Sequence, residues 1–361
     1  MDTETIGKDI LLGKTLEELR LVAEDCGMPG YASKQINGWL YNKHVTSISE
    51  MTNLSKTSRE RLSQKYDVGC CEPVDVAEDK DGTRKYLFPA RNGGFVETVF
   101  LPEGKRAAVC ISSQVGCKMH CAFCLTGRGG FKSQLSAAEI LNQLYSLPER
   151  DKLTNIVLMG QGEPLDNYDN VMRAYEILTG KDGFGFSPRR ITLSTCGVLP
   201  KLKRLVAESE MNIAISLHSP FHEERMEIMP AERAFPINDV VAFLKTCEEF
   251  RDTYGISERE TSHQRKLSFE YVLLKGKNDT PKHISALKHL LKGLDCRMNV
   301  IPFHSYPGCL FQSPTQEEAM AFCQELERNG IRATMRRSRG KSISAACGML
   351  AARRSKSAYQ K

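Results

Sequence analysis

Beyond Pro102 the chain alternates between short apolar runs and helix-length segments, and this alternation limits the possible folds more than any other feature. Apolar runs of this kind, bounded by turn signals, are typical of buried strands. Six strands are expected, at 107–111, 156–159, 191–193, 213–217, 267–274 and 298–301. Strands that alternate with helices form a parallel sheet, and right-handed crossovers curl it into a barrel or part of one. We therefore predict an α/β fold with a partial (βα)6 barrel.

Helix signals fill the N-terminal part and the segments between the strands. Thr15 and Glu18 form a capping box, and Gly27 closes the helix that follows. A second helix is expected at 32–41, and the best marked helix between the strands runs over 136–147 from another capping box. A third helical stretch near the N-terminus carries basic residues that are either a solvated face or phosphate contacts: Lys56, Arg59, Arg61 and Lys65.

From residue 74 the pattern changes to strand alternation with turn signals. The turns Asp81-Gly82 and Asn92-Gly93-Gly94 separate three expected strands at 74–77, 85–88 and 95–101, which form a short antiparallel meander. We predict three parts: a small N-terminal accessory domain of helices and meander over 1–102, a core domain over 103–340, and a C-terminal segment over 341–361.

Three cysteines, Cys117, Cys121 and Cys124, stand at a C-x3-C-x2-C spacing with no fourth cysteine close by. Cysteine thiolates in short runs are the normal ligands of iron–sulfur clusters, and three of them leave the fourth iron of a cubane cluster open for a non-protein ligand. A structural zinc site wants four protein ligands, commonly as two separated pairs, and His120 lies inside the first loop. The spacing favours an open 4Fe-4S cluster; zinc and unligated buried cysteines are the alternatives.

Polar and glycine residues follow the expected strands, where a parallel sheet binds its ligands. The second strand ends in Gly160-Gln161-Gly162-Glu163, the third at Ser194 and the fourth at Ser216-Leu217-His218. Glycines let the backbone approach a ligand closely, and Glu163 can accept hydrogen bonds from an ammonium group. A plain turn or a helix cap would look the same at any one tip, but together the tips predict a ring of ligand-binding residues.

Composition sets the outer limits. With 361 residues, of which 41% are hydrophobic, the chain has material for about two domains. No apolar run approaches the roughly 18 residues of a membrane span, and the first residues lack a secretory signal, so we expect a cytoplasmic protein without a membrane partner. Thirteen cysteines, an odd number in a long chain, fit reduced thiols and a cluster better than a disulfide framework.

The formal charge of +6 is modest, but lysine and arginine concentrate near the ends of the chain. The C-terminal basic residues are Arg332, Arg336, Arg337, Arg339, Lys341, Arg353, Arg354 and Lys356. Nucleic acid is a reasonable partner on this distribution, although a charge run alone does not decide it.

The cysteine spacing, with Phe123 before the third cysteine, resembles the radical S-adenosylmethionine (SAM) enzymes. Further motifs, in this order along essentially the whole chain, resemble the RlmN/Cfr family of radical adenosine methyltransferases, and its dual-specificity RlmN branch most closely. These motifs are 112–117, 159–164, 191–195, 215–218 and Ala345-Ala346-Cys347-Gly348. The resemblance implies a partial radical SAM barrel that methylates C2 of adenosine in 23S rRNA and of the adenosine beside the anticodon in tRNA.

The resemblance also implies the cofactors, a 4Fe-4S cluster and two SAM molecules per turnover. In this family the open iron chelates the amino and carboxylate groups of SAM, and an electron from the cluster then leaves a 5′-deoxyadenosyl radical. Adenine C2 is not nucleophilic, so a detour is needed: Cys347 takes a methyl from one SAM, and the radical from the second removes a hydrogen from it. The carbon radical then adds to C2.

Release of the product needs a second thiol and a base. By resemblance, Cys110 attacks Cys347 to form a disulfide as the methylated base departs, and Glu97 accepts the proton bound to carbon. Read by itself, Glu97 would be an exposed partner of a strand lysine, and each cysteine a small core residue.

The same resemblance implies that SAM contacts fall on matching positions, which are Gly162, Glu163, Ser194, Ser216, Leu217, His218 and His304. At His304 many relatives carry an asparagine, so the chain departs from the family pattern there. A neutral imidazole can still donate or accept one hydrogen bond.

The expected partners are the 23S rRNA and tRNA substrates and an electron donor such as flavodoxin, and we expect a monomer. An enzyme that reaches a buried adenosine must read unfolded or splayed RNA, and the N-terminal helices and the basic C-terminal run are candidate phosphate contacts. Two alternatives stay open at this point: C8 methylation as in the Cfr branch, which confers antibiotic resistance, and an iron–sulfur RNA-binding protein without catalysis.

Overall fold

The computed structural model describes residues 8–251, 265–306, 308–337, 339–340, 342–345 and 348–350. Cys347, the predicted methyl carrier, lies outside the described residues, as do Lys341 and the basic residues beyond 350. Among the helices in these ranges, none is both long and apolar enough to cross a membrane.

One large sheet organises the fold. In the described part of the chain it has ten strands in the order β14-β13-β12-β11-β10-β9-β6-β5-β4-β3. Neighbours from β6 to β14 are parallel, and neighbours from β3 to β6 are antiparallel. The parallel strands are β6 (Arg106–Cys110), β9 (Asn155–Leu158), β10 (Ile191–Thr195), β11 (Asn212–Ser216), β12 (Leu267–Leu273), β13 (Cys296–Pro302) and β14 (Ala333–Met335). The meander consists of β3 (Asp75–Glu78), β4 (Arg84–Pro89) and β5 (Phe95–Glu103).

The six predicted barrel strands and the three meander strands are confirmed to within two residues at either end. The sheet also extends past the prediction at both edges. The sequence pattern missed β14, which pairs with β13 from Met298↔Ala333 to Val300↔Met335. On the other side β5 pairs with β6 from Val99↔Cys110 to Glu103↔Arg106, so the meander belongs to the same sheet. The boundary expected at residue 102 stays a prediction, and the sheet runs across it.

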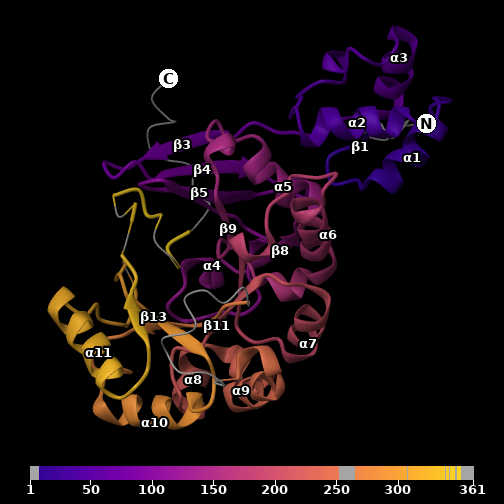
Figure 1. The fold of residues 1–361 in the computed structure, drawn as a ribbon. Coiled ribbons are helices and arrows are strands. Elements are labelled where there is room, and N and C mark those ends of the chain that lie inside the picture. Colours follow the sequence, from indigo (N-terminus) through magenta and orange to yellow (C-terminus); the bar gives the residue numbers. More distant parts are fainter. Residues whose placement is uncertain are drawn as a thin grey trace, which may run out of the picture.

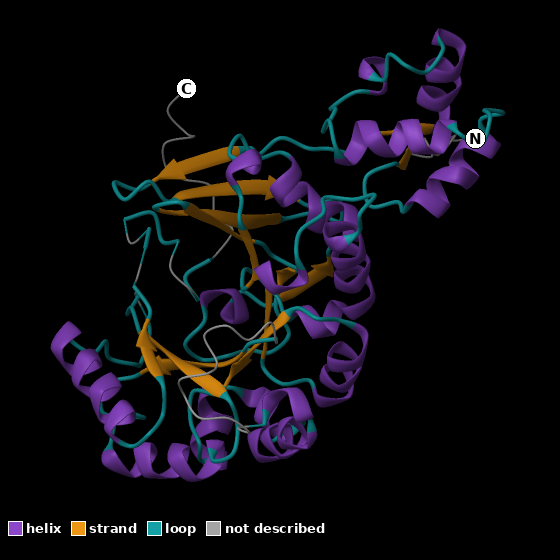
Figure 2. Ribbon diagram, viewed as in Figure 1, coloured by secondary structure: helices purple, strands orange, loops and turns teal. Residues whose placement is uncertain are grey.

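Helices cover the outer side of the parallel strands, while three others form a lobe beside the sheet (Figures 1 and 2). The lobe contains α1 (Leu16–Asp25), α2 (Ala32–Tyr41) and α3 (Lys56–Lys65). The outer layer contains α5 (Ala137–Tyr145), α6 (Tyr168–Thr179), α7 (Leu199–Glu208), α8 (His222–Ile228), α9 (Ile237–Thr246), α10 (Pro281–Leu291) and α11 (Gln316–Arg328). The single turn α4 (Leu125–Arg128) follows the cysteines.

Shorter elements complete the chain. β1 (Asp9–Ile10) pairs with β2 (Tyr66–Asp67), and β7 (Gln114–Gly116) pairs with β8 (Phe131–Gln134) on either side of the cysteine loop. Short 3-10 turns are η1 (Ile48–Glu50), η2 (Arg150–Lys152), η3 (Pro164–Asn167), η4 (Pro188–Arg190), η5 (Pro230–Arg233) and η6 (Glu248–Phe250).

The capping signals set two helix starts. Glu18 N donates to Thr15 Oγ1 over 3.4 Å, and Thr15 N donates to Glu18 Oε2 over 2.9 Å. Ser136 and Glu139 make the same reciprocal pair at the start of α5, so both predicted capping boxes are confirmed. Each cap satisfies helix N–H groups that have no partner within the helix, and contributes about 1 kcal/mol.

Alternation along the strands separates the core from the site. On β10 the fully buried Ile191 and Leu193 pack in the main core, whereas Ser194, one residue on, must point to the opposite face of the sheet. The core continues into the N-terminal lobe. There Tyr145 Oη donates to Val45 O over 2.7 Å, and Arg173 on α6 forms an ion pair with Glu18 on α1.

Candidate active site

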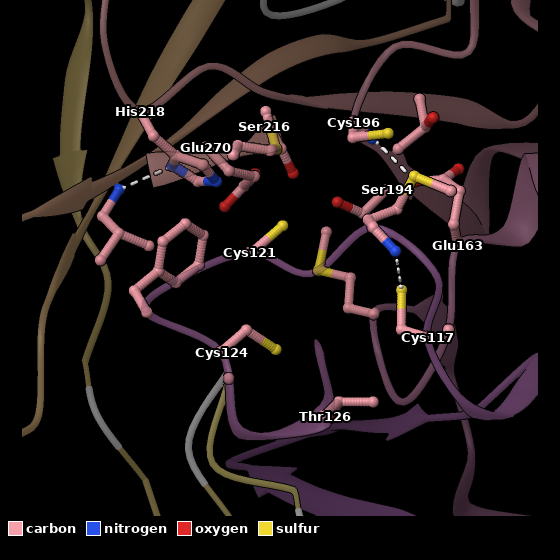
Figure 3. Close-up of a pocket in the computed structure, with 18 of the residues that line it drawn as sticks. Cys117, Cys121, Cys124, Thr126, Glu163, Ser194, Cys196, Ser216, His218 and Glu270 are labelled. Carbon is pink, nitrogen blue, oxygen red and sulfur yellow. Dashed lines mark hydrogen bonds between the residues drawn. The ribbon is translucent and has the colours of Figure 1, made fainter. Parts of the chain in front are cut away.

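A cavity of about 150 Å³ lies inside the barrel, between the cysteine loop and the C-terminal tips of the parallel strands (Figure 3). We call it the cysteine cavity. Among the predicted site residues, it is lined by Cys117, Cys121, Cys124, Gly162, Glu163, Ser194, Ser216 and His218. Predicted residues from four regions of the sequence therefore meet here, as the strand-tip argument predicted.

The cysteine loop is fixed at both ends by backbone contacts. Gly116 has φ +77°, and a Cβ there would stand 1.8 Å from Gly130 O, so only glycine fits. The next residue, Cys117, donates its N–H to the same carbonyl over 3.1 Å. Further along, Ala122 N donates to Ile228 O at the end of α8 over 2.8 Å. These contacts fix the path of the loop before any ligand binds.

The thiols of this loop are poorly solvated. Burial raises the pKa of Cys117 to about 12, and burial together with the neighbouring thiols raises the pKa of Cys121 well above its ordinary value. Cysteines bind a cluster as thiolates. The positive charge of bound iron would stabilise these thiolates, which burial alone disfavours. His120 is exposed and does not line the cavity, which agrees with its exclusion as a fourth ligand.

Within the described residues, no group of three His, Cys, Asp or Glu side chains surrounds one metal-sized position. A cubane cluster does not require such a group, because each of its thiolates binds a different iron. Cys196, which follows β10 and was not among the predicted site residues, also lines the cavity. Its thiol is hydrogen-bonded to the Glu163 carboxylate, and Figure 3 shows the two side by side.

The Glu163 carboxylate is buried but well supported. Its Oε2 accepts from Cys196 N over 2.8 Å and its Oε1 accepts from Leu165 N over 3.0 Å. Burial raises the pKa of Glu163, and these hydrogen bonds act in the opposite direction. A buried carboxylate that lines a cavity is suited to pair with a cationic group of a ligand, because an ammonium would offset its desolvation.

The two glycines before Glu163 line the cavity and are also needed for packing. A Cβ on Gly160 would lie 2.7 Å from Ile111 O, and a Cβ on Gly162, whose φ is +100°, would lie 2.6 Å from Gln114 Cβ. Both glycines therefore permit close approach of the turn after β9 to the segment after β6. This packing also places Glu163 at the cavity.

His218 occupies a strained and fully buried position after β11. Its φ is +60°, and its Nδ1 accepts a hydrogen bond from Val272 N over 3.0 Å. Burial lowers the pKa of His218 to about 3, so the ring is neutral and carries its proton on Nε2. The Phe123 ring packs edge-on against it at 4.7 Å between centroids. His218 thus presents a fixed N–H donor.

Leu217 does not line the cavity, since its side chain is fully buried in the main core. Its backbone holds the tip of β11 instead: Leu217 N donates to Glu270 O over 2.9 Å, and Leu217 O accepts from Arg225 Nε over 2.9 Å. Strand alternation explains the difference, because Ser216 and His218 point to the other face.

A buried arginine that the sequence pattern did not reveal ties two strand tips together. Arg225 on α8 donates to Cys196 O over 2.9 Å and to Ser216 O over 2.8 Å. Both Arg225 and its ion-pair partner Glu232 are fully buried. Removal of either partner would leave an uncompensated charge, at a cost of about 3–5 kcal/mol.

Glu270 was also missed, although a charged residue inside the apolar β12 run was a usable signal. It lines the cysteine cavity and is 3% exposed. Its Oε1 accepts from Asn299 Nδ2 over 2.8 Å, and its Oε2 lies 3.4 Å from Arg336 Nη1. Arg336 follows β14, the strand that the pattern missed, and it lines the same cavity.

His304 lies away from the other expected SAM contacts. It lines a second cavity of about 480 Å³, together with several arginines, and not the cysteine cavity. We call the second one the arginine cavity. The two cavities share Ile301 and Arg336 in their linings.

Glu97 and Cys110 stand on adjacent antiparallel strands beside the cysteine cavity, without lining it. Glu97 is 2% exposed, and Lys85 Nζ lies 2.8 Å from its Oε1. The strand lysine expected as a partner is therefore present, but Glu97 is buried, and Lys85 is partly buried. Cys110 packs with Val99 and Leu350 in a small apolar cluster that also contacts Met159 and Ala345.

The residues on either side of Cys347 bridge the meander and the cysteine loop. Lys85 Nζ donates to Ser344 O over 3.5 Å, and Ala345 packs in the cluster around Cys110. On the other side, Gly348 lines the cysteine cavity and its carbonyl accepts from Leu125 N over 2.8 Å. Leu350 O accepts from Thr126 Oγ1 over 2.8 Å.

The basic C-terminal run divides in the structure. Arg332 forms an ion pair with Asp295 and also donates to Cys296 O over 2.9 Å. Arg336, Arg337 and Arg339 line the arginine cavity instead. On α3, Lys65 pairs with Asp25 over 2.7 Å. For Lys56, Arg59 and Arg61, a solvated face and phosphate contacts both stay open as interpretations.

Comparison with known proteins gives matches over almost the whole chain. Residues 111–285 match the radical SAM superfamily, and residues 10–68 match the ribosomal RNA large subunit methyltransferase N-terminal domain. The probable dual-specificity RNA methyltransferase RlmN of Bacteroides thetaiotaomicron is 51% identical over 340 residues, which are 94% of this chain and 95% of that protein. The dual-specificity RNA methyltransferase RlmN of Syntrophobacter fumaroxidans is 41% identical over 94% of this chain and 96% of its own length.

A solved structure agrees with these matches. The crystal structure of a radical SAM methyltransferase from Sphaerobacter thermophilus superimposes with a TM-score of 0.87 at 38% identity, and covers 96% of this chain and 100% of that one. The superfamily uses a 4Fe-4S cluster and SAM, and a cavity lined by three thiols, a buried carboxylate and strand-tip hydroxyls fits both groups. The chain therefore belongs to the RlmN family of radical SAM RNA methyltransferases.

Proposed function

We propose that this enzyme methylates C2 of an adenosine in 23S rRNA and of the adenosine beside the anticodon in tRNA. The observation that carries the proposal is the meeting of Cys117, Cys121 and Cys124 with the strand-tip residues around one cavity. Relatives named as dual-specificity RNA methyltransferases support the choice of RNA.

The residues of the cysteine cavity have distinct roles in this proposal. The three cysteine thiolates would hold three irons, and Glu163 would accept from the ammonium of SAM. His218 offers its Nε2–H, and Ser194 and Ser216 offer hydroxyls, to the polar groups of the nucleoside. Gly162 and Leu217 act through their backbones. When bound, the cluster and SAM supply the radical that starts the reaction.

A relay of two thiols and a base would complete the transfer. In this proposal Cys347 carries the methyl group, Cys110 resolves the bond between protein and RNA, and Glu97 accepts the proton from the base carbon. Support comes from the neighbours of Cys347: Ala345 packs near Cys110, and Gly348 lines the cysteine cavity. Lys85 Nζ lies 2.8 Å from Glu97 Oε1, so the proposed proton acceptor has a basic side chain beside it.

Several further expectations belong to the same proposal. The part over 1–102 would contribute to RNA binding, 103–340 would form the catalytic core, and 341–361 would present Cys347. An electron donor such as flavodoxin, a monomeric state and a cytoplasmic location complete it. His304 would contact SAM only after moving from the arginine cavity, so we place it with the RNA side of the site.

The test is methylation by the reconstituted enzyme. Protein with a cluster rebuilt without oxygen is given dithionite, SAM with a labelled methyl group, and 23S rRNA fragments or tRNA, and the nucleosides are analysed by mass spectrometry. We expect labelled 2-methyladenosine from the native protein and from Cys71→Ala, whose residue is exposed and lines neither cavity, but none from Cys347→Ala.

The other outcomes decide between the alternatives. Labelled 8-methyladenosine would show that the enzyme methylates C8 of the adenosine and not C2. RNA binding without cleavage of SAM would indicate a non-catalytic protein, and full activity of Cys347→Ala would remove the relay from the proposal.

A further inference from the structure

We propose that the arginine cavity binds the phosphodiester backbone of the RNA strand that carries the target adenosine. This inference rests on the proposed function and adds to it the site that positions the substrate. The cavity is lined by Leu101, Glu103, Arg106, Ala108, Asn155, Ile301, His304, Thr334, Met335, Arg336, Arg337, Arg339 and Ala345.

Its position is the first reason. Ile301 and Arg336 line both cavities, and Arg336 is held between them because its Nη1 lies 3.4 Å from Glu270 Oε2 and 3.3 Å from Met159 Sδ. Met159 and Glu270 belong to the cysteine cavity. A strand bound in the arginine cavity therefore lies beside the place where SAM would bind.

The second reason is its contact with the proposed thiol relay. Leu101 and Ala345 line the arginine cavity, and both also pack against the apolar cluster that contains Cys110. Ala345 lies two residues before Cys347 in the sequence. A nucleotide whose backbone occupies this cavity could direct its base toward Cys110 and toward the cavity that Gly348 lines.

Charge is the third reason. Four arginines and His304 face one acid, Glu103, around a single cavity. Arg339 pairs with Glu103 over 3.1 Å and Arg336 pairs with Glu270. Arg106 and Arg337 are exposed, and within the described part of the chain neither forms an ion pair with an acidic side chain. Clustered guanidinium groups repel one another. A phosphate group relieves this repulsion, because two of its oxygens can accept the two parallel N–H bonds of an arginine.

Size and access agree with a nucleotide and not with a small ion. A volume of about 480 Å³ is within the range of typical ligand sites, roughly 300–1,000 Å³. Arg106 belongs to β6 and Arg337 follows β14, so the two bring charge from opposite edges of the parallel part of the sheet. A ribose-phosphate unit could lie between them, whereas a free phosphate would leave most of the volume empty.

The experiment measures RNA binding by the Arg106→Ala/Arg337→Ala double variant with its cluster in place. The probe is a short fluorescein-labelled single-stranded RNA with one adenosine, titrated by anisotropy at several salt concentrations. Loss of two contacts should make the slope of log K against log salt shallower by about 1.4. The affinity lost relative to the native protein should therefore be roughly 25 times greater at 0.1 M salt than at 1 M salt. The KM for RNA should rise with the Kd.

Matched variants separate this site from a general charge effect. Arg297 is exposed near the N-terminal end of β13 and does not line either cavity, so Arg297→Ala removes one charge elsewhere and should keep the native slope. Arg106→Lys/Arg337→Lys keeps both charges and should keep most of the slope, with weaker binding because lysine cannot pair bidentately. Iron content equal to that of the native protein shows that the variants fold.

Three outcomes would overturn the inference. The double alanine variant could keep the native salt slope, or it could lose no more than twice the RNA affinity that Arg297→Ala loses. Alternatively, its methylation activity could fall only when a protein electron donor replaces dithionite. The last would assign the cavity to an acidic protein partner. Failure of the proposed function is distinguishable, because it would appear as missing 2-methyladenosine while RNA binding still depended on Arg106 and Arg337.

Discussion

At the scale of single residues, burial explains most of the chemistry of the candidate site. Cys117, Cys121, Glu163 and His218 are all largely withdrawn from water, and in each case burial is the main cause of the shifted pKa. Burial raises the pKa of Cys117, Cys121 and Glu163, so a ligand that brings positive charge would favour their ionised forms. His218 is neutral throughout the physiological range and so acts as a permanent donor.

His218 predicts a pH dependence of stability. Its pKa is lowered to about 3 in the folded chain, so below pH 6.5 the unfolded chain binds a proton that the folded chain does not. Stability should therefore fall as pH falls, by up to about 1.4 kcal/mol per pH unit from this residue. Asparagine can replace the Nδ1 acceptor and tolerates positive φ.

We expect the urea midpoint of the cluster-free protein to drop less between pH 7 and pH 5 in His218→Asn than in the native protein. The exposed His289→Asn variant is the control and should follow the native protein. Equal pH sensitivity in His218→Asn and the native protein would mean that the His218 ring is not held neutral by the fold.

The cysteines predict a second result at this scale. Cys121→Ala should lose the bound iron and the cluster absorbance, because it removes one of three ligands. Cys196→Ala should keep both, since Cys196 donates to Glu163 in this structure and lies outside the spaced motif. Iron analysis after anaerobic reconstitution checks both variants, and loss of iron in Cys196→Ala would show that the cluster has a fourth protein ligand.

At the scale of elements, the local signals were sufficient for most helices and strands. The capping boxes at Thr15 and Ser136 mark the starts of α1 and α5, and each apolar run of the barrel marks a strand. These signals lie within the elements that they predict. β14 was not predicted, because its three residues form a strand only by pairing with β13. The joining of β5 to β6, in contrast, is local: only Gly104 and Lys105 separate Glu103 from its partner Arg106, so a turn pattern could have predicted this pairing.

The candidate site was predictable to the same extent. Strand-tip residues could be placed because a parallel sheet brings its C-terminal ends together. Leu217 and His304 do not line the cysteine cavity. Strand alternation directs the Leu217 side chain into the core, and His304 lines the arginine cavity. Arg225 bonds to a strand tip that lies 29 residues earlier, and Arg336, named only as part of the basic run, pairs with Glu270, so only the fold reveals these roles.

The turn after β9 gives a prediction at the element scale. A Cβ on Gly162 would meet Gln114 Cβ at 2.6 Å, and the residue also has φ +100°, so Gly162→Ala carries both a clash and a backbone penalty. Gly185 has φ +69° with nothing near its Cβ position, so Gly185→Ala carries the backbone penalty alone, about 1–2 kcal/mol.

Chemical unfolding should therefore show a larger loss of stability for Gly162→Ala than for Gly185→Ala, and isothermal titration should show weaker SAM binding only for Gly162→Ala. Equal losses in both variants, with unchanged SAM binding, would contradict the close packing of the turn against the segment after β6.

At the scale of the whole molecule, described residues near the C-terminus connect the meander with the cysteine loop. Gly340 N donates to Asp81 Oδ2, in the turn between β3 and β4, over 3.3 Å, and the Gly348 carbonyl accepts from Leu125 N over 2.8 Å. Among these residues, Ala345 lines the arginine cavity and Gly348 lines the cysteine cavity. Such an arrangement can deliver SAM from one side and RNA from the other.

The central claim is that a methyl group passes from SAM to RNA through Cys347. The most direct measurement preloads Cys347 with a labelled methyl group, removes the labelled SAM, and then adds unlabelled SAM, reductant and RNA for a single turnover. We predict that the first 2-methyladenosine carries the label from the protein. Unlabelled 2-methyladenosine in the first turnover, with the label still on the protein, would contradict the claim.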